Sequence, residues 1–228
     1  AKDWLSVQVH PDDAYGLEHE GELGKTECWY IIDAEEGAEI IYGHKAKTKE
    51  ELASLIEAGD WDGLLSKTPV KKGDFFFVPS GTMHAIGPGI LILETQQSSD
   101  TTYRVYDFDR RDDQGNKREL HIEKTKDVTK VPFEKVTTSP KTEKLEGATV
   151  TYLADERYFS VFKVEVEGQV SLEKTRTGNL FTVLNGSGSV EIDGSSYDVK
   201  KGDSFILTTD CRTYTLKGKM FLIGSYDR

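Results

Sequence analysis

Cysteine is scarce in this sequence, and this scarcity excludes one class of protein. The 228 residues include only two cysteines, Cys28 and Cys211, and these form no CxxC pair. A small secreted domain stapled by disulfides carries many more cysteines. We therefore expect two free thiols in a reducing compartment, the cytoplasm, with a single Cys28–Cys211 bridge as the alternative.

Long apolar runs and a surplus of basic residues are also missing. No apolar run approaches the roughly 20 residues that span a bilayer, and no secretory leader opens the sequence. Lys and Arg number 29 against 40 Asp and Glu, which gives a net charge of −11. Binding to nucleic acid or to an anionic membrane needs a basic face, so we expect neither as a partner.

A β-strand pattern is present throughout. Short runs rich in Val, Ile, Phe and Tyr alternate with turn residues, which favours a mainly β fold. In the first half, the predicted strands cover residues 4–10, 28–32, 39–42, 75–78, 90–94 and 102–106. In the second half, they cover residues 159–166, 181–184, 189–192, 204–207, 213–216 and 220–223, with Gly186, Gly188, Gly194 and Gly218 near the turns. Short strands at this spacing are typical of sandwiches and barrels.

Residues 48–67 interrupt the strand pattern with apolar side chains at helical spacing. Thr48 and Glu51 form a capping box, and Gly59 is a suitable helix stop. We therefore predict a small helical insert at 48–67. The charge-dense stretch 107–127 is expected to be a solvated hairpin or connection.

An internal repeat indicates two similar halves. Residues 70–78 (VKKGDFFFV) match residues 199–207 (VKKGDSFIL) at an offset of 129. Two copies of one β-unit predict two cupin-like jelly-roll or barrel halves, at 1–132 and 149–228. A proline-containing linker at 133–148 is expected to join them.

The two copies of the repeat differ in the residues that follow them. The first copy leads to His84, whereas Thr213 holds the corresponding position after the second copy. No histidine occurs after His121. We therefore expect a metal site in the first half alone, with the second half packing against or shielding it.

Polar residues in the first half indicate where that metal would bind. Gln8 and His10 alternate on a predicted strand, so their side chains share one face, where buried polar groups need a partner such as a metal ion. Residues 73–84 carry the pattern G-x5-P-x-G-x2-H, which resembles the second motif of the cupin superfamily. The first cupin motif is altered here, because Gln8 stands for its first histidine and Glu27 lies beyond the usual gap.

Four separated motifs resemble type I mannose-6-phosphate isomerase in its short bacterial form. They are residues 5–11 (LSVQVHP), 24–27 (GKTE), 79–84 (PSGTMH) and 102–107 (TYRVYD). The resemblance runs over residues 4–132 and continues more weakly beyond them. Members of this family carry a further N-terminal segment, so we expect such a segment upstream of this sequence.

The resemblance implies a set of site residues. The family's metal ligands fall on Gln8, His10, Glu27 and His84, which would hold one Zn²⁺ per chain. Its active-site arginine falls on Arg104, its K-x-E lysine on Lys25, and a residue near the substrate phosphate on Ser6. Considered by themselves, two imidazoles and a carboxylate suit Zn²⁺ and leave a position for water or substrate.

The resemblance also implies an activity, the interconversion of mannose 6-phosphate and fructose 6-phosphate through an enediol. Arg104 and Lys25 would supply positive charge for the phosphate or for the enediolate. The general base is open between Glu94 and Lys25, with Asp13 and Asp100 as further candidates. The expected partner is thus a small sugar phosphate, and the expected assembly is a monomer or a weak homodimer.

Two other functions fit the same residues. His10, Glu27 and His84 also match the two-His-one-carboxylate set of non-haem iron oxygenases. A non-catalytic sugar-binding or storage cupin is the third hypothesis. Turnover of a hexose phosphate, oxygen uptake and metal content would distinguish the three.

Overall fold

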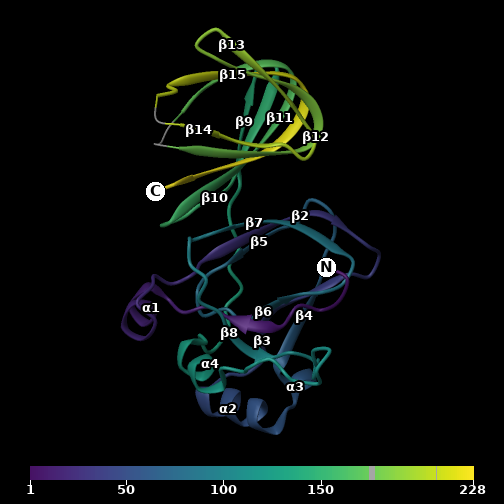
Figure 1. The fold of residues 1–228 in the computed structure, drawn as a ribbon, viewed down its shortest axis with the longest axis vertical. Helices are drawn as coiled ribbons and strands as arrows, with labels where there is room; N and C mark the ends of the chain where they lie inside the picture. Colours follow the sequence, from purple (N-terminus) through teal and green to yellow (C-terminus); the bar gives the residue numbers. More distant parts are fainter. Residues whose placement is uncertain (175–177, 209) are drawn as a thin grey trace. The chain divides into compact units, whose positions relative to one another are not determined.

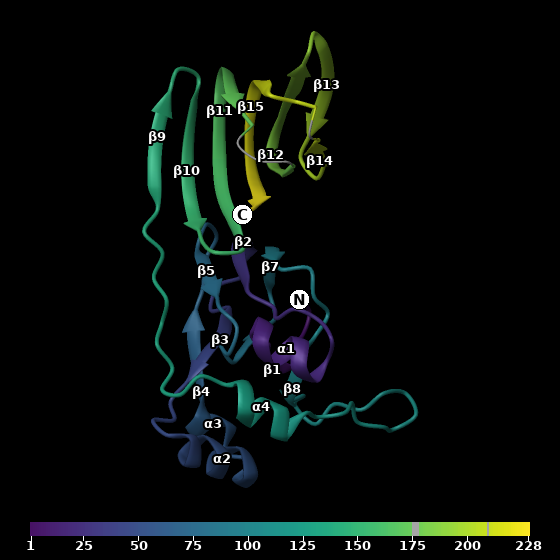
Figure 2. The same ribbon diagram turned by 90° about the vertical axis from the view of Figure 1, so that its left-hand side faces the viewer.

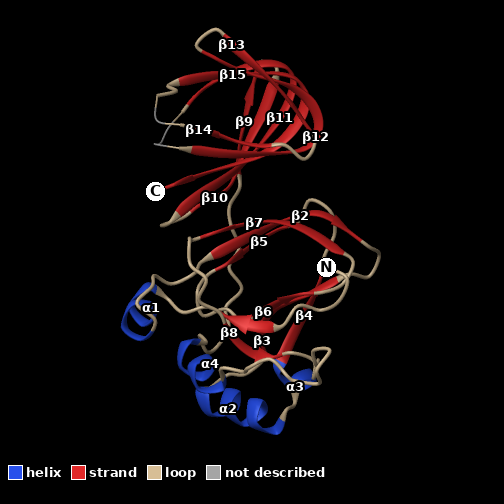
Figure 3. Cartoon of the chain, in the orientation of Figure 1, coloured by secondary structure: helices blue, strands red, loops and turns tan. Residues whose placement is uncertain are grey.

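The chain folds into two units that are built mainly of strands. The computed structural model describes residues 1–174, 178–208 and 210–228. Within them, residues 1–137 and 138–228 form two compact units (Figure 1). Helices of the described residues all lie in the first unit (Figure 3), and none is long and apolar enough to cross a membrane. The predicted mainly β fold is confirmed.

The first unit consists of two sheets and four short helices. One sheet has the strand order β4-β3-β6-β1-β8, with bounds Leu65–Pro69, Glu39–His44, His84–Ile86, Val7–Val9 and Tyr103–Tyr106. The other has the order β5-β2-β7, with bounds Phe75–Val78, Glu27–Ala34 and Ile90–Gln96. The helices are α1 (Asp13–His19), α2 (Lys49–Ala58), α3 (Trp61–Leu64) and α4 (Ile122–Val128). Figure 1 shows the two sheets facing each other, with α2, α3 and α4 on the outer side of the five-stranded sheet.

Successive side chains along the strands of the five-stranded sheet point to opposite faces, and each face packs into its own apolar core. Ile41 and Ala85, which pair across β3 and β6, pack with Leu52 and Ile56 of α2. The opposite face of the same strands packs against Trp29 and other residues of the three-stranded sheet. Burying an aliphatic side chain of this size contributes about 2 kcal/mol to stability. The outer face of the five-stranded sheet is therefore covered by helices. Its inner face lies between the two sheets and carries polar as well as apolar residues.

The predicted helical insert is confirmed in its first part and ends earlier than expected. Thr48 caps α2, because its side chain accepts a hydrogen bond of 3.2 Å from the Glu51 backbone N–H. The helix ends at Gly59, whose φ of 65° lies in the left-handed region. The last residues of the predicted insert instead form β4, which pairs antiparallel with β3 from Leu65 onward. Ladder hydrogen bonds to β3 outweigh the helical spacing there.

Two short helices were not predicted. α4 ends the charge-dense stretch that was expected to be solvated connection. α1 lies between His10 and Glu27 and is capped by Asp12, whose side chain accepts a 3.0 Å hydrogen bond from the Tyr15 backbone N–H. Each has only seven residues, which is too few for an apolar stripe to repeat.

The second unit is one strongly paired antiparallel system. Its strand order is β13-β12-β15-β11-β10-β9, and β14 pairs with β12. The bounds are Ser195–Lys200, Asn179–Ile192, Thr213–Asp227, Phe159–Glu173, Ala148–Asp155, Lys141–Leu145 and Ser204–Leu207 in the same order. In the described part of the chain this ladder does not close on itself, so the unit is an open, curved sheet (Figure 2).

The predicted linker at 133–148 is wrong in its second part. Lys141–Leu145 forms strand β9, which pairs with β10 in a hairpin around Gly147. Four of the five side chains of β9 are exposed, so the alternation that marks a half-buried strand is missing from its sequence. Pairing with β10 and the packing of Leu145 against the core of the second unit hold it in the sheet.

The predicted turns at Gly186, Gly188 and Gly218 are wrong, because these glycines lie inside the long strands β12 and β15. Gly168 of β11 and Gly188 of β12 both pair with Gly218 of β15, which gives a row of glycines across three strands. A Cβ atom at Gly188 would lie 1.9 Å from the carbonyl oxygen of Lys217. The strands therefore approach closely at this row, and glycine lets the sheet bend without breaking. The predicted turn at Gly194 is confirmed between β12 and β13.

Candidate metal centre

The inner face of the five-stranded sheet carries a row of polar side chains. Tyr42 of β3 pairs with His84 of β6, and His84 pairs with Gln8 of β1. Gln8 pairs in turn with Arg104 of β8. Residues directly opposite each other in antiparallel strands project from the same face. Because Tyr42 packs in the core between the two sheets, this row faces the three-stranded sheet.

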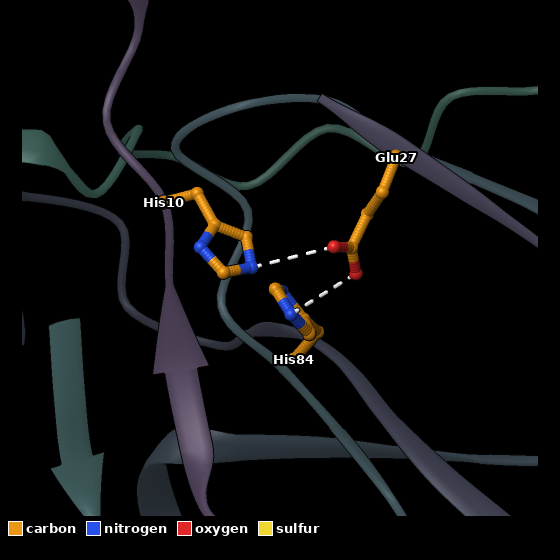
Figure 4. A group of neighbouring side chains, drawn as sticks. All are labelled: His10, Glu27 and His84. Atoms are coloured by element: carbon orange, nitrogen blue, oxygen red, sulfur yellow. Dashed lines mark ion pairs between the residues drawn. The ribbon is translucent and has the colours of Figure 1, made fainter. Parts of the chain in front are cut away.

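Glu27 meets this row from the opposite sheet. It begins β2, and its carboxylate lies between two imidazoles (Figure 4). Its Oε2 atom is 3.4 Å from His10 Nε2, and its Oε1 atom is 3.3 Å from His84 Nε2. All three side chains are at most 2% exposed, and their ligand atoms lie within 4.8 Å of one another.

Backbone carbonyls fix how the two imidazoles present their nitrogens. His10 Nδ1 lies 2.8 Å from the Thr101 carbonyl oxygen, and His84 Nδ1 lies 2.9 Å from that of Thr82. A carbonyl can only accept, so both Nδ1 atoms carry the proton and donate. The Nε2 atoms then point toward Glu27. This is the arrangement by which proteins orient histidine ligands of a metal.

The charge states of these groups leave a cluster of acceptors. Burial lowers the pKa of His84 to about 4, so its Nε2 carries a lone pair at neutral pH. Burial alone would raise the pKa of Glu27, but the nearby His84, His10 and Lys25 outweigh it and lower the value to about 2. His10 Nε2 and both carboxylate oxygens of Glu27 have no hydrogen-bond partner among the described residues. Buried acceptors without donors are costly, and a divalent cation satisfies all of them.

Gln8 can complete this donor set. Its side-chain amide nitrogen lies 3.3 Å from His84 Nε2. Rotating the amide by half a turn exchanges its nitrogen for its oxygen at the same place. The residues present, two imidazole nitrogens, a carboxylate and an amide oxygen, therefore fit a divalent metal.

A lysine and a second carboxylate adjoin Glu27. Lys25 Nζ is 3.3 Å from Glu27 Oε2 and 3.6 Å from Glu94 Oε1. Burial, and then the negative charge of Glu27, raises the pKa of Glu94, while Lys25 opposes the rise. Lys25 is held in the interior at 9% exposure by its backbone N–H, which donates to the Pro11 carbonyl over 3.1 Å. The structure thus brings Lys25 and Glu94 together beside the candidate metal ligands.

Arg104 lies beyond Gln8 in the same row. Its Nε donates to Ser6 Oγ over 3.3 Å and its Nη1 donates to the Glu119 carbonyl over 2.9 Å. Among the described residues Arg104 makes no ion pair with a carboxylate. Its guanidinium therefore keeps its charge available for an anion, and Ser6 lies beside it.

The two further base candidates have other surroundings. Asp13 accepts hydrogen bonds from the Gly24 backbone N–H and the Gln97 side chain. It therefore fixes the loop after α1. Asp100 is exposed at the surface. The group of described residues that could hold a metal consists of His10, Glu27 and His84 and includes neither aspartate.

The residues that orient the candidate metal ligands without belonging to them were not predicted from the sequence. Thr82 and Thr101 act through backbone carbonyls, which carry no residue-type signal. Gln97 accepts from the Thr26 backbone N–H over 2.7 Å and so holds the strand end that carries Lys25 and Glu27. No sequence signal indicated this role, because Gln97 lies three residues beyond the predicted strand 90–94 and directly after the observed β7.

Comparison with known proteins identifies close relatives. The family model for the cupin domain of mannose-6-phosphate isomerase matches residues 148–227. A mannose-6-phosphate isomerase of Streptococcus mutans is 57% identical over 99% of this chain and 71% of its own length. One from Bacillus subtilis is 52% identical over 97% of this chain and 71% of its own length.

Solved structures show the same fold. The crystal structure of the mannose 6-phosphate isomerase from Bacillus subtilis has a TM-score of 0.96 and 47% identity, covering 99% of this chain and 72% of that one. A putative mannosephosphate isomerase from Archaeoglobus fulgidus, at 21% identity and a TM-score of 0.75 over 100% of this chain and 69% of that one, is similar in fold alone. The chain thus matches somewhat more than two thirds of each of these proteins.

Proposed function

Since the chain belongs to the mannose-6-phosphate isomerase family, as its motifs predicted, we propose that it interconverts mannose 6-phosphate and fructose 6-phosphate. The observation that carries this proposal is the buried His10–Glu27–His84 group with its unpartnered acceptors. Lys25 neutralises part of the Glu27 charge, but His10 Nε2 and Glu27 Oε1 keep no donor, and a bound cation would satisfy both. The group lies in the first unit, which we propose is the catalytic one.

The proposed metal is one Zn²⁺ per chain. Its ligands would be Gln8, His10, Glu27 and His84. When bound, the ion supplies an electrophile that withdraws charge from substrate oxygens, an effect worth several kcal/mol in a closed site. The second unit, in its described residues, contains no comparable group, and we propose that it has a supporting role.

Lys25 and Arg104 are proposed to bind the negative charges of the substrate. A protein with a net charge of −11 repels a sugar phosphate unless local cations offset that field. Arg104 offers a planar fork of donors for a phosphate, and Ser6 adds a hydroxyl beside it. Lys25 offers a point charge close to the metal ligands.

Glu94 is proposed as the group that moves the proton. Aldose–ketose exchange removes a proton from C2 and returns it to C1, while the hydroxyl proton passes from O2 to O1, so no proton is gained or lost. A carboxylate whose pKa is raised is a better base near neutral pH than an ordinary one. Lys25, 3.6 Å away, would hold Glu94 in place, and it is the second candidate for the base.

Turnover and metal content test this function. The chain, loaded with Zn²⁺, should isomerise mannose 6-phosphate without consuming oxygen. Oxygen uptake with bound iron would instead favour the oxygenase, which the two-His-one-carboxylate geometry also fits. Sugar-phosphate binding without turnover would indicate the non-catalytic cupin. Either result would contradict the proposal.

The compartment and the oligomeric state of the protein are proposed as well. Both cysteines are buried and free, so nothing in the described structure requires an oxidising compartment. We propose that the protein works in the cytoplasm as a monomer or weak homodimer. Sedimentation velocity over a range of concentrations would measure the assembly.

A further inference from the structure

The segment that precedes α4 runs along the free edge of β8 and contacts Arg104 at three points. The Glu119 carbonyl accepts from Arg104 Nη1 over 2.9 Å. The His121 backbone N–H donates to the Arg104 carbonyl over 2.7 Å, and His121 Nδ1 accepts from the Arg104 backbone N–H over 3.1 Å. Both the backbone and the guanidinium of Arg104 are therefore held by residues 119–121.

The side chain of His121 contacts Arg104 instead of capping α4. It is the N-cap residue of α4, yet its side chain makes no capping hydrogen bond. An N-cap side chain ordinarily accepts from a backbone N–H of the first helical turn. Here the ring turns back to Arg104 and supplies the acceptor that a neighbouring strand would otherwise provide at the edge of β8.

Asp107 anchors the same segment from its other side. Its buried carboxylate accepts from Arg118 Nε over 2.8 Å, and Arg118 Nη2 also donates to it, so the ion pair is bidentate. Arg110 donates to the same carboxylate. Burial opposes the charge on Asp107, but Arg118 and Arg110 outweigh it and lower its pKa. Arg118 directly precedes Glu119, so this ion pair fixes the carbonyl that holds Arg104.

The turn after Asp107, which brings Arg110 to the same carboxylate, has an unusual backbone conformation. Phe108 and Asp109 have φ values of 53° and 54°, in the left-handed region that favours glycine. The turn brings the Arg110 backbone N–H to 3.1 Å from the Asp107 carbonyl. Phe108 packs against Tyr106 with ring centroids 4.7 Å apart. Two consecutive residues keep such backbone angles only where surrounding contacts determine them, which is common near functional sites. Figure 2 shows the rest of the β8–α4 connection as a long projecting loop.

We propose that Arg118 and His121 are positioning residues for Arg104. Arg118 fixes the Glu119 carbonyl that accepts from the guanidinium, His121 fixes the backbone of Arg104, and together they keep the guanidinium in one orientation for the phosphate of the substrate. This inference rests on the proposed function. An arginine side chain loses much rotamer freedom when it binds an anion, and a preorganised one loses less. Arg118 and His121 do not contact the substrate in this account. Their effect on binding passes through Arg104.

The test is a double-mutant cycle in which the dissociation constant of a ligand is measured for each variant. The ligand is a hexitol phosphate, which has the phosphate and hydroxyls of the substrate but cannot isomerise. Arg118→Gln should weaken its binding about tenfold in the otherwise unchanged enzyme, and not further in the Arg104→Ala background. In steady-state kinetics, Arg118→Gln should raise KM for mannose 6-phosphate about tenfold and leave kcat within about twofold. Asp107 keeps Arg110 as a partner in this variant, so the unit is expected to fold.

A matched control and a second variant complete the design. Arg111→Gln removes an equal charge from the same loop, but Arg111 donates to the Gly115 carbonyl and does not contact Asp107. It should leave the affinity and KM unchanged. His121→Ala should behave like Arg118→Gln, because it removes a different contact to the same arginine.

Each contrary result has a distinct meaning. If Arg118→Gln weakens binding equally with and without Arg104, the residue acts on its own and the positioning role is overturned. Unchanged affinity in both Arg118→Gln and His121→Ala overturns it as well. If Arg104→Ala itself leaves the affinity unchanged, the role given to Arg104 under the proposed function fails, and the positioning role fails with it.

Discussion

The two units share one turn and differ in what lies beyond it. In the first unit, Asp74 Oδ2 accepts from the Lys71 backbone N–H over 3.0 Å; in the second, Asp203 Oδ2 accepts from that of Lys200 over 2.9 Å. The glycine of each turn donates to a neighbouring strand over 2.9 Å. The Lys-Lys-Gly-Asp repeat therefore builds the same local structure twice, as the sequence predicted.

Beyond this turn, the interiors of the units diverge. The first unit places His84, 1% exposed, between its sheets, where it meets Glu27. The second unit has an exposed Thr213 at the corresponding position and fills its interior with apolar residues such as Leu216 and Leu222. One β-unit can thus serve as a scaffold for a polar site or as a packed core. The residues on the inward face decide which.

The largest effect should follow from removing the inward histidine. His84→Ala deletes a proposed metal ligand, so activity should fall about a thousandfold or more and metal content should drop below one per chain. Thr213→Ala, the matched change in the second unit, should leave both unchanged. Steady-state kinetics and elemental analysis measure the pair. Full activity in His84→Ala would contradict the assignment of the site to the first unit.

A core truncation should affect the second unit through stability alone. Leu216 is fully buried, so Leu216→Ala leaves a cavity and should lower the free energy of unfolding by about 3 kcal/mol. The control Ile206→Ala alters a side chain that is 60% exposed and should change it by less than about 0.5 kcal/mol. Urea unfolding followed by circular dichroism measures both. A loss of kcat in folded Leu216→Ala would show that the second unit does more than support the first.

Acid should weaken the first unit through Asp107. The pKa of this carboxyl is lowered in the folded state, so its ion pairs stabilise the fold above the ordinary value of 3.8. That contribution is lost as the pH falls through the lower, folded-state pKa. All three tryptophans lie in the first unit, so their fluorescence reports its unfolding. Urea midpoints measured from about pH 6 to about pH 3 should fall less steeply in Asp107→Asn. An identical slope would contradict the ion-pair account.

The smallest effect should be the same in both units. Asp74→Ala and Asp203→Ala each remove the side-chain acceptor of one Lys-Lys-Gly-Asp turn. Each should lower the free energy of unfolding by about 1 kcal/mol, the usual contribution of one such hydrogen bond. Asp74 also pairs with Lys71 Nζ, but that lysine is exposed, so the ion pair adds little. Urea unfolding of the two variants, compared directly, tests this equality. A large difference would mean that the turns contribute differently despite their common geometry.

Much of the local structure could be predicted because it depends on neighbouring residues. The cap at Thr48 and the repeated turn each need only a few consecutive residues. α1 and α4 escaped prediction because seven residues cannot show a helical period, and β9 because its exposed side chains do not alternate. The row at Gly188 and Gly218 was mistaken for turns, since close approach of strands leaves the same residue type as a turn.

For the site, the sequence by itself determined the chemical types: two histidines, a glutamate and a glutamine in a family pattern, with Lys25 and Arg104 nearby. Only the tertiary structure decided that Glu27 reaches His10 and His84 from the facing sheet, and that the carbonyls of Thr101 and Thr82 turn the imidazoles toward it. Residue type sets which atoms can donate or accept. Whether those atoms find partners depends on strands distant in sequence, because burial removes water as the alternative partner.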